Sequence, residues 1–115
     1  MITLYGIPNC DSVKKGRNWL DENGHEYSFH DFRKQGLDAA LLKAWLKKAD
    51  WKVLLNTKGT TWRTLSEEQR ANPDLAKATE LMLAHPTLIK RPVVAHAGGL
   101  LVGFDAERWA AELSA

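Results

Sequence analysis

Residues 1–32 read MITLYGIPNCDSVKKGRNWLDENGHEYSFHDF, and their pattern decides the fold of the chain. Residues 1–6 are apolar and rich in β-forming side chains, which predicts a strand. Residues 12–23 place apolar side chains at helical intervals, and residues 25–32 alternate polar and apolar side chains like a second strand. A strand, a helix and a strand at this spacing predict a βαβ unit.

The turn between the first strand and the helix contains Cys10, the only cysteine in the chain. Asp11 or Ser12 is the expected N-cap of the helix, because short polar side chains bond the first free amides of a helix. Asn23-Gly24 is the expected stop of the helix. Cys10 is therefore predicted to lie just before the start of a helix.

Beyond this unit the pattern becomes mainly helical and then returns to strands. The predicted elements are a helix from Asp38 through Lys48, a short apolar segment at 51–55, a polar loop at 56–62, a helix beginning at Ser66, a helix from 72–74 toward His85, a hairpin of strands 92–96 and 100–102, and a last helix that carries Trp109. The predicted fold class is α/β with the order β-α-β, a helical insert over about residues 36–86, then β-β-α. Because 115 residues fit one domain, residues 1–115 are expected to form a single one.

The composition is that of an ordinary soluble protein and limits the functions to be considered. Sixteen Lys and Arg residues against fourteen Asp and Glu residues leave a formal charge of +2, too balanced to predict direct binding of nucleic acid or of a membrane. There is no apolar run of transmembrane length and no secretory signal pattern. A single cysteine excludes an internal disulfide, and the expected location is the cytoplasm.

The position of Cys10 makes its thiol a candidate nucleophile. The first N–H groups of a helix have no internal partners and lie at the positive end of the helix dipole, so they stabilise a thiolate, which is the nucleophilic form. Lys14 lies one turn further on and adds positive charge. The alternative is a buried cysteine that packs as a small hydrophobe. The turn-forming neighbours Pro8, Asn9 and Asp11 favour the functional interpretation.

Two further segments are candidates for the site. Arg91 and Pro92 precede a predicted strand, and a guanidinium there offers planar donors for an oxyanion or a carboxylate. The alternative is an ordinary trans proline with a solvated arginine. Residues 56–63 combine hydroxyls, the cations Lys58 and Arg63, a glycine and an aromatic ring. That composition suits a loop that binds an anionic peptide or a thiol cofactor, and equally an exposed connection.

The four histidines have no metal-ligand spacing, so no metal site is predicted.

Four blocks of sequence resemble the arsenate reductase-like (ArsC) family, in the family's order. They are LYGIPNCDSVKK at 4–15, FHDFR at 29–33, LLNTKGTTWR at 54–63 and PTLIKRPV at 86–93. The resemblance covers nearly the whole chain and is closest to the small YffB branch, which is related to the Spx and MgsR regulators. It implies a thioredoxin-like fold with a mixed four-stranded sheet and a helical insert.

The resemblance also implies roles for individual residues. The nucleophilic cysteine of the family corresponds to Cys10, and the arginine of its Arg-Pro motif corresponds to Arg91, beside an expected cis Pro92. Glutathione-coupled arsenate reductases of the family surround the oxyanion with three arginines, whereas this chain has Asn56 and Gly103 at the other two positions. The loss of two guanidinium groups disfavours arsenate as the natural substrate. The Cys-x-x-Cys switch of Spx-type regulators is absent, because its fourth position is Val13.

Two functions follow from these residues and this resemblance. The first is a glutathione-dependent thiol reductase in which Cys10 and Arg91 are catalytic and Lys14 gives electrostatic support. In that function Asn9, Asn56, Lys58, Arg63 and Pro92 would bind the substrate or glutathione. Since the chain has no second cysteine, an external thiol must resolve any covalent intermediate. The alternative is a Spx-like regulator that docks on RNA polymerase.

Overall fold

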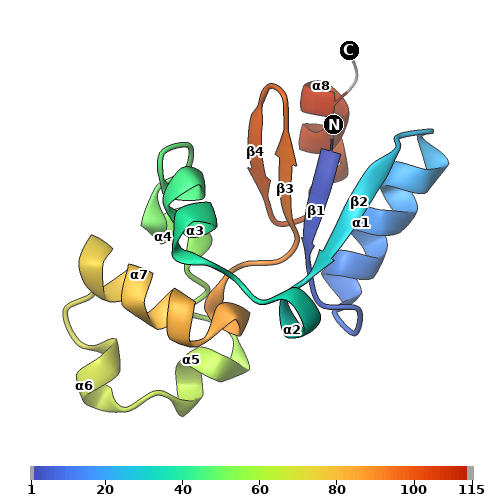
Figure 1. The fold of residues 1–115 in the computed structure, drawn as a ribbon. Coiled ribbons are helices and arrows are strands. Elements are labelled where there is room, and N and C mark those ends of the chain that lie inside the picture. Colours follow the sequence, from blue (N-terminus) through green and yellow to red (C-terminus); the bar gives the residue numbers. More distant parts are fainter. Residues whose placement is uncertain (1, 114–115) are drawn as a thin grey trace. The chain divides into compact units, whose positions relative to one another are not determined.

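A computed structural model describes residues 2–113 and all of their side chains except that of Arg33. The elements in chain order are β1 (Ile2–Gly6), α1 (Asp11–Glu22), β2 (Tyr27–Asp31), α2 (Phe32–Gln35), α3 (Ala39–Leu46), α4 (Trp51–Leu54), α5 (Thr60–Thr64), α6 (Glu67–Arg70), α7 (Leu75–Ala84), the 3₁₀ helix η1 (Pro86–Leu88), β3 (Val93–His96), β4 (Gly99–Val102) and α8 (Ala106–Leu113) (Figure 1). The predicted order of β-α-β, helices, then β-β-α is confirmed.

The chain divides into two compact units. One unit comprises the residues up to Gly36 together with those from Arg91 onward, and the other comprises Leu37–Lys90. The first unit contains the four-stranded sheet, in the order β2-β1-β3-β4. β1 and β2 are parallel, while β1 with β3 and β3 with β4 are antiparallel, so the sheet is mixed as predicted.

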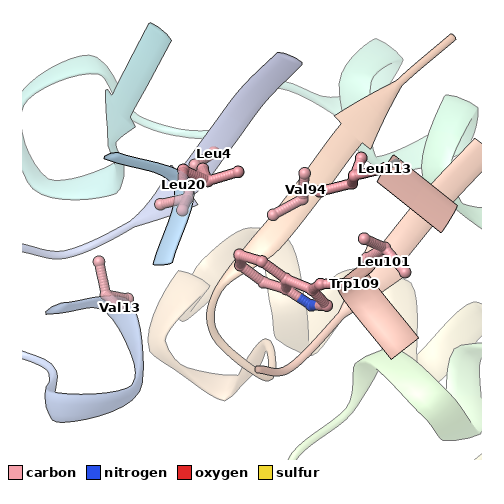
Figure 2. Close-up of a cluster of buried hydrophobic side chains, with 7 residues drawn as sticks. All are labelled: Leu4, Val13, Leu20, Val94, Leu101, Trp109 and Leu113. Carbon is pink, nitrogen blue, oxygen red and sulfur yellow. The ribbon is translucent and has the colours of Figure 1, made fainter. Parts of the chain in front are cut away.

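The core of the first unit lies on one face of this sheet, which α1 and α8 cover. Successive residues of a strand point to opposite faces, so Leu4, Val94 and Leu101 share a face and contact the inner sides of both helices. Figure 2 shows the seven buried side chains of this cluster, which are Leu4, Val13, Leu20, Val94, Leu101, Trp109 and Leu113. Val13 and Leu20, two of the apolar residues at helical spacing in the predicted helix, are thus buried in this core.

Two glycines allow α1 to approach its neighbours closely. A Cβ added to Gly6 at the end of β1 would lie 2.6 Å from a methyl carbon of Val13. A Cβ added to Gly16 would lie 2.7 Å from the ring of Trp109 and 3.3 Å from Cγ of Pro92. Real Cβ atoms do not come within 3.0 Å of other heavy atoms, so both positions need glycine unless a neighbour moves.

Gly16→Val is therefore expected to destabilise the fold by about 2 kcal/mol or more, because the added carbons overpack a rigid, buried indole. Chemical denaturation followed by circular dichroism measures the effect. Asn18→Val is the matched control, because it places the same β-branched residue at an exposed position of the same helix. Equal destabilisation by the two variants would contradict the close-packing explanation.

The second unit consists of short helices, three of which begin at the predicted polar caps. Asp38 accepts from the amide of Leu41, Asp74 accepts from the amide of Lys77, and Ser66 forms a capping box with Gln69. Within this unit α7 packs against α3 and α4. The predicted polar loop at 56–62 is wrong in its second half, because Thr60–Thr64 is helical.

Candidate active site

The predicted site residues of the first unit gather at one edge of the sheet. At its carboxyl end β1 leads to Cys10, which is the N-cap residue of α1. β3 runs antiparallel to β1 and pairs Val93 with Tyr5. Arg91 and Pro92, which precede Val93, therefore lie beyond the end of β1, at the same edge of the sheet as Cys10.

Cys10 itself caps the helix, and the predicted cap at Asp11 or Ser12 is wrong. The carbonyl of Cys10 accepts the first helical hydrogen bond from the amide of Lys14 at 3.0 Å, and its backbone is extended (φ −96°, ψ 126°). Its side chain makes no capping bond to any residue that the structure describes. Cys10 is thus the N-cap residue by its backbone, at the helix end where the first amides lack backbone partners.

The thiol of Cys10 is partly exposed. It packs against the rim of the core cluster defined above and is not enclosed by it. Asn9 and Lys14 are exposed on either side along the chain. A thiol in this position is accessible to a small reactant and lies at the positive end of the dipole of α1.

The Arg91–Pro92 peptide bond is cis, as the family resemblance implied. Pro92 is buried, and its ring lies against Gly16 in the second turn of α1. The carbonyl of Pro92 accepts from the amide of Gly103 at 2.8 Å. Arg91 is partly buried. These contacts anchor the segment that carries Arg91 to both α1 and the end of the β3–β4 hairpin.

The other three predicted site residues belong to the second unit. The segments around Leu55 and Ile89 form an antiparallel bridge, in which the amide of Asn56 donates to the carbonyl of Leu88 at 2.7 Å. Oδ1 of Asn56 accepts from the amide of Lys58 at 3.0 Å and closes the turn. Lys58 and Arg63 are exposed. Sequence reasoning did not anticipate that the side chain of Asn56 would be used within its own turn.

At two positions where this sequence differs from the related families, the structure shows what the residue present does in the fold. Val13, which the resemblance places at the second cysteine of the Spx-type switch, is fully buried in the core cluster and packs against Gly6. Gly103, which the resemblance places at a third arginine, has φ +79°, in the left-handed region that favours glycine. Both residues are therefore integrated into the packing or the backbone geometry of the first unit.

Across residues 2–113, no group of three or more His, Cys, Asp or Glu side chains is arranged to hold a metal ion. Within the same residues, no helix has the length and apolar character needed to cross a membrane.

Comparison with known proteins identifies the relatives of this chain. A solved structure of a protein called YffB is 49% identical, covers 98% of this chain and 99% of its own, and superposes with a TM-score of 0.94. The solution structure of an arsenate reductase (ArsC) related protein from Brucella melitensis is also 49% identical, covers 99% and 95% of the two chains, and gives a TM-score of 0.78. The global transcriptional regulator Spx of Listeria innocua is 28% identical over 91% of this chain and 81% of its own length.

The mixed four-stranded sheet with its helices is thus a thioredoxin-like fold of the kind found in arsenate reductase-like thiol oxidoreductases. The family model of the ArsC family matches residues 5–112, and the chain belongs to that family.

Proposed function

We propose that this protein is a glutathione-dependent thiol reductase with Cys10 as its nucleophile. The observation that carries the proposal is the position of Cys10, whose thiol is partly exposed and whose backbone forms the N-cap of α1. The first amides of α1 lack backbone partners there, and the positive end of the helix dipole lies at the same point. The absence of a second cysteine from the sequence requires a separate thiol as the resolving reductant, and glutathione is the proposed one. The proposed location is the cytoplasm.

The reaction proceeds by successive thiol–disulfide exchanges. The thiolate of Cys10 attacks a substrate disulfide R–S–S–R′, forms Cys10–S–S–R and releases R′–S⁻, which takes up a proton. A glutathione thiolate attacks the sulfur of Cys10, forms the Cys10–glutathione disulfide and releases R–S⁻, which is also protonated. A second glutathione thiolate then regenerates the thiolate of Cys10 and leaves with its partner as oxidised glutathione. The substrate disulfide gains two electrons and two protons, and two glutathione molecules supply them.

In this mechanism Arg91 stabilises the thiolate of Cys10 and the charge on the departing sulfur. Lys14 contributes a weaker, more screened electrostatic effect because it is exposed. Asn9 and Pro92 are proposed to border the bound substrate. In the second unit, Asn56, Lys58 and Arg63 are proposed to bind the carboxylate at the glycine end of glutathione. Asn56 contributes by closing the turn that carries Lys58.

A disulfide is a better substrate than arsenate for this arrangement. An oxyanion with several negative charges needs several donors, and two of the three arginine positions hold Asn56 and Gly103. A disulfide reaction develops a single charge on a departing sulfur, for which one guanidinium is sufficient.

The experiment that tests the proposal measures turnover of the mixed disulfide between glutathione and β-mercaptoethanol. Oxidised glutathione is followed through glutathione reductase and NADPH, with the intact protein and glutathione as the only thiol. The expected result is a rate well above that of the uncatalysed exchange. A rate equal to the uncatalysed one overturns the proposal, and turnover only with dithiothreitol overturns the glutathione dependence.

Arg91→Gln is expected to lower kcat/KM in this assay by about 10- to 100-fold, the effect of losing one charge-assisted hydrogen bond of about 1.5–3 kcal/mol. The matched control is Arg108→Gln, which removes the same charge from an exposed pair with Glu112 on α8. An unchanged kcat/KM for Arg91→Gln would exclude its proposed catalytic role.

A second candidate function is a regulator that docks on RNA polymerase, which the similarity to Spx proteins favours. Docking without redox control is consistent with a buried Val13 in place of the second cysteine of the switch. A binding assay with purified RNA polymerase distinguishes the two functions. Binding that survives Cys10→Ser, together with no disulfide turnover by the intact protein, would favour the regulator.

A further inference from the structure

A hollow lies along α1, and Lys14 is the one lining residue that the mechanism above uses. Its volume is about 290 Å³, and Lys14, Arg17, Asn18 and Asp21 line it. A second hollow of about 490 Å³ shares Asp21 and continues over the start of β2, with His25, Glu26, Tyr27 and Ser28. Lys14, Arg17 and Asp21 follow Cys10 at intervals of four, three and four residues, which places all of them on one stripe of the helix.

The guanidinium of Arg17 is held in place by two contacts with β2. Its Nε donates to the hydroxyl of Tyr27 at 3.1 Å, and its Cζ lies 4.3 Å from the ring centroid of Phe29. Within the described part of the chain, the Nη groups have no hydrogen-bond or ion-pair partner. The side chain is therefore fixed through its inner edge, while its outer pair of donors is available for a planar carboxylate.

Arg17 and Asp21 carry opposite charges on the same stripe of α1 but do not form an ion pair with each other. Residues four apart on a helix are neighbours, and charges of opposite sign in that spacing commonly pair. Among the described residues, no ion pair joins these two, although both line the hollow of 290 Å³. The hollow therefore offers a cation and an anion that are not paired with each other. Such a hollow suits a ligand that carries both a negative and a positive charge.

A free α-amino-acid group has this chemistry, because it bears a carboxylate and an ammonium on one carbon. Glutathione carries such a group at its γ-glutamyl end. Seven residues of helix rise about 10 Å from Cys10 to Arg17. The γ-glutamylcysteine arm has a length close to that of three extended residues, about 10 Å, and a disulfide bond adds about 2 Å. The arm is therefore long enough to join the two positions.

We infer that the hollow lined by Lys14, Arg17, Asn18 and Asp21 binds the zwitterionic γ-glutamyl end of glutathione. Arg17 takes the carboxylate, Asp21 takes the ammonium, and Tyr27 is a positioning residue that holds Arg17. The inference rests on the proposed function for its choice of ligand and names the element that recognises glutathione. A free amino acid carries the same chemical group and is the alternative source of the ligand.

The test titrates S-methylglutathione into the intact protein and follows backbone amide signals by NMR. This probe cannot form a disulfide, so its binding does not depend on the reactivity of Cys10. The expected result at millimolar concentrations is a saturable shift of the amides of Arg17, Asn18 and Asp21. Arg17→Gln is expected to weaken binding about 10-fold, and Tyr27→Phe, which removes only the positioning hydroxyl, about 2- to 3-fold.

Lys15→Gln is the matched control, because it makes the same change of charge at an exposed residue of α1 that lines neither hollow. S-methylcysteinylglycine, which lacks the γ-glutamyl group, is expected to leave the three amides unshifted. Absent shifts, equal binding of that dipeptide, or unchanged binding by Arg17→Gln would overturn the inference. Binding of free glutamate as tight as that of S-methylglutathione would assign the hollow to a free amino acid and overturn it as well.

The outcomes separate this inference from the proposed function. Binding of S-methylglutathione without disulfide turnover would refute the reductase and retain the hollow as a γ-glutamyl site. Turnover with glutathione that is insensitive to Arg17→Gln, together with absent amide shifts, would retain the reductase and refute the hollow.

Discussion

Cys10→Ser is expected to reduce glutathione-dependent disulfide turnover by about 10³-fold or more, because a serine hydroxyl neither ionises at neutral pH nor forms a disulfide. The sequence offers no other sulfur nucleophile, since Cys10 is the only cysteine. The measurement is the coupled assay with β-mercaptoethanol–glutathione disulfide. Mass spectrometry gives an independent readout, because oxidised glutathione should add one glutathionyl group to the native protein and none to the variant.

The control for this substitution is the stability of the fold. Cys10 lies at the rim of the core and is partly exposed, so the loss of its sulfur should cost no more than about 1 kcal/mol of unfolding free energy. A folded Cys10→Ser protein that keeps native turnover would show that Cys10 is not the nucleophile. If Cys10→Ser loses both turnover and the fold, Cys10→Ala replaces it as the test variant, because an apolar side chain is closer in polarity to a half-buried thiol. A folded Cys10→Ala protein without turnover would then support Cys10 as the nucleophile.

Trp109→Ala is expected to cause the largest loss of stability, about 3–5 kcal/mol. Its indole is fully buried, and its ring centroid lies 5.7 Å from that of Trp19 and 4.9 Å from that of Phe104, both edge to face. Its Nε1 donates to the carbonyl of Gly103 at 3.1 Å. Truncation would remove this bond and leave a large cavity against Gly16.

Urea denaturation followed by circular dichroism measures the effect, and Trp51→Ala is the matched control because Trp51 is only partly buried on α4. Trp109→Phe should cost less than Trp109→Ala, since it keeps most of the packing and loses the hydrogen bond. A loss below about 1 kcal/mol for Trp109→Ala would contradict the central role of this indole in the core of the first unit.

Local patterns predicted most of the elements correctly. Strands, amphipathic helices and their caps depend on residues a few positions apart, which explains why Asp38, Ser66 and Asp74 begin helices where the sequence indicated. The helix at Thr60–Thr64 was missed, because threonine has a weak helix propensity and the segment resembles a loop. The cap at Cys10 was placed one or two residues too late for a similar reason, since aspartate and serine are the commoner caps.

The site depended on long-range information that periodicity does not carry. The family resemblance supplied the cis Arg91–Pro92 bond, whereas residue patterns alone favour trans. Helical periodicity identifies Arg17 only as a polar residue of the helix predicted over 12–23. Its contacts with Tyr27 and Phe29 bring together residues ten and twelve positions apart, on two elements joined only by tertiary packing.

The left-handed backbone of Gly103 disfavours the introduction of an oxyanion-binding arginine at this position. The left-handed conformation costs an L-residue other than glycine about 1–2 kcal/mol of conformational free energy. The amide of Gly103 also donates a hydrogen bond to the carbonyl of Pro92. Gly103→Arg would therefore strain the backbone bend at residue 103, whose amide holds the carbonyl of Pro92. A variant with an arginine at this position would therefore carry a backbone cost that accompanies any gain in oxyanion binding.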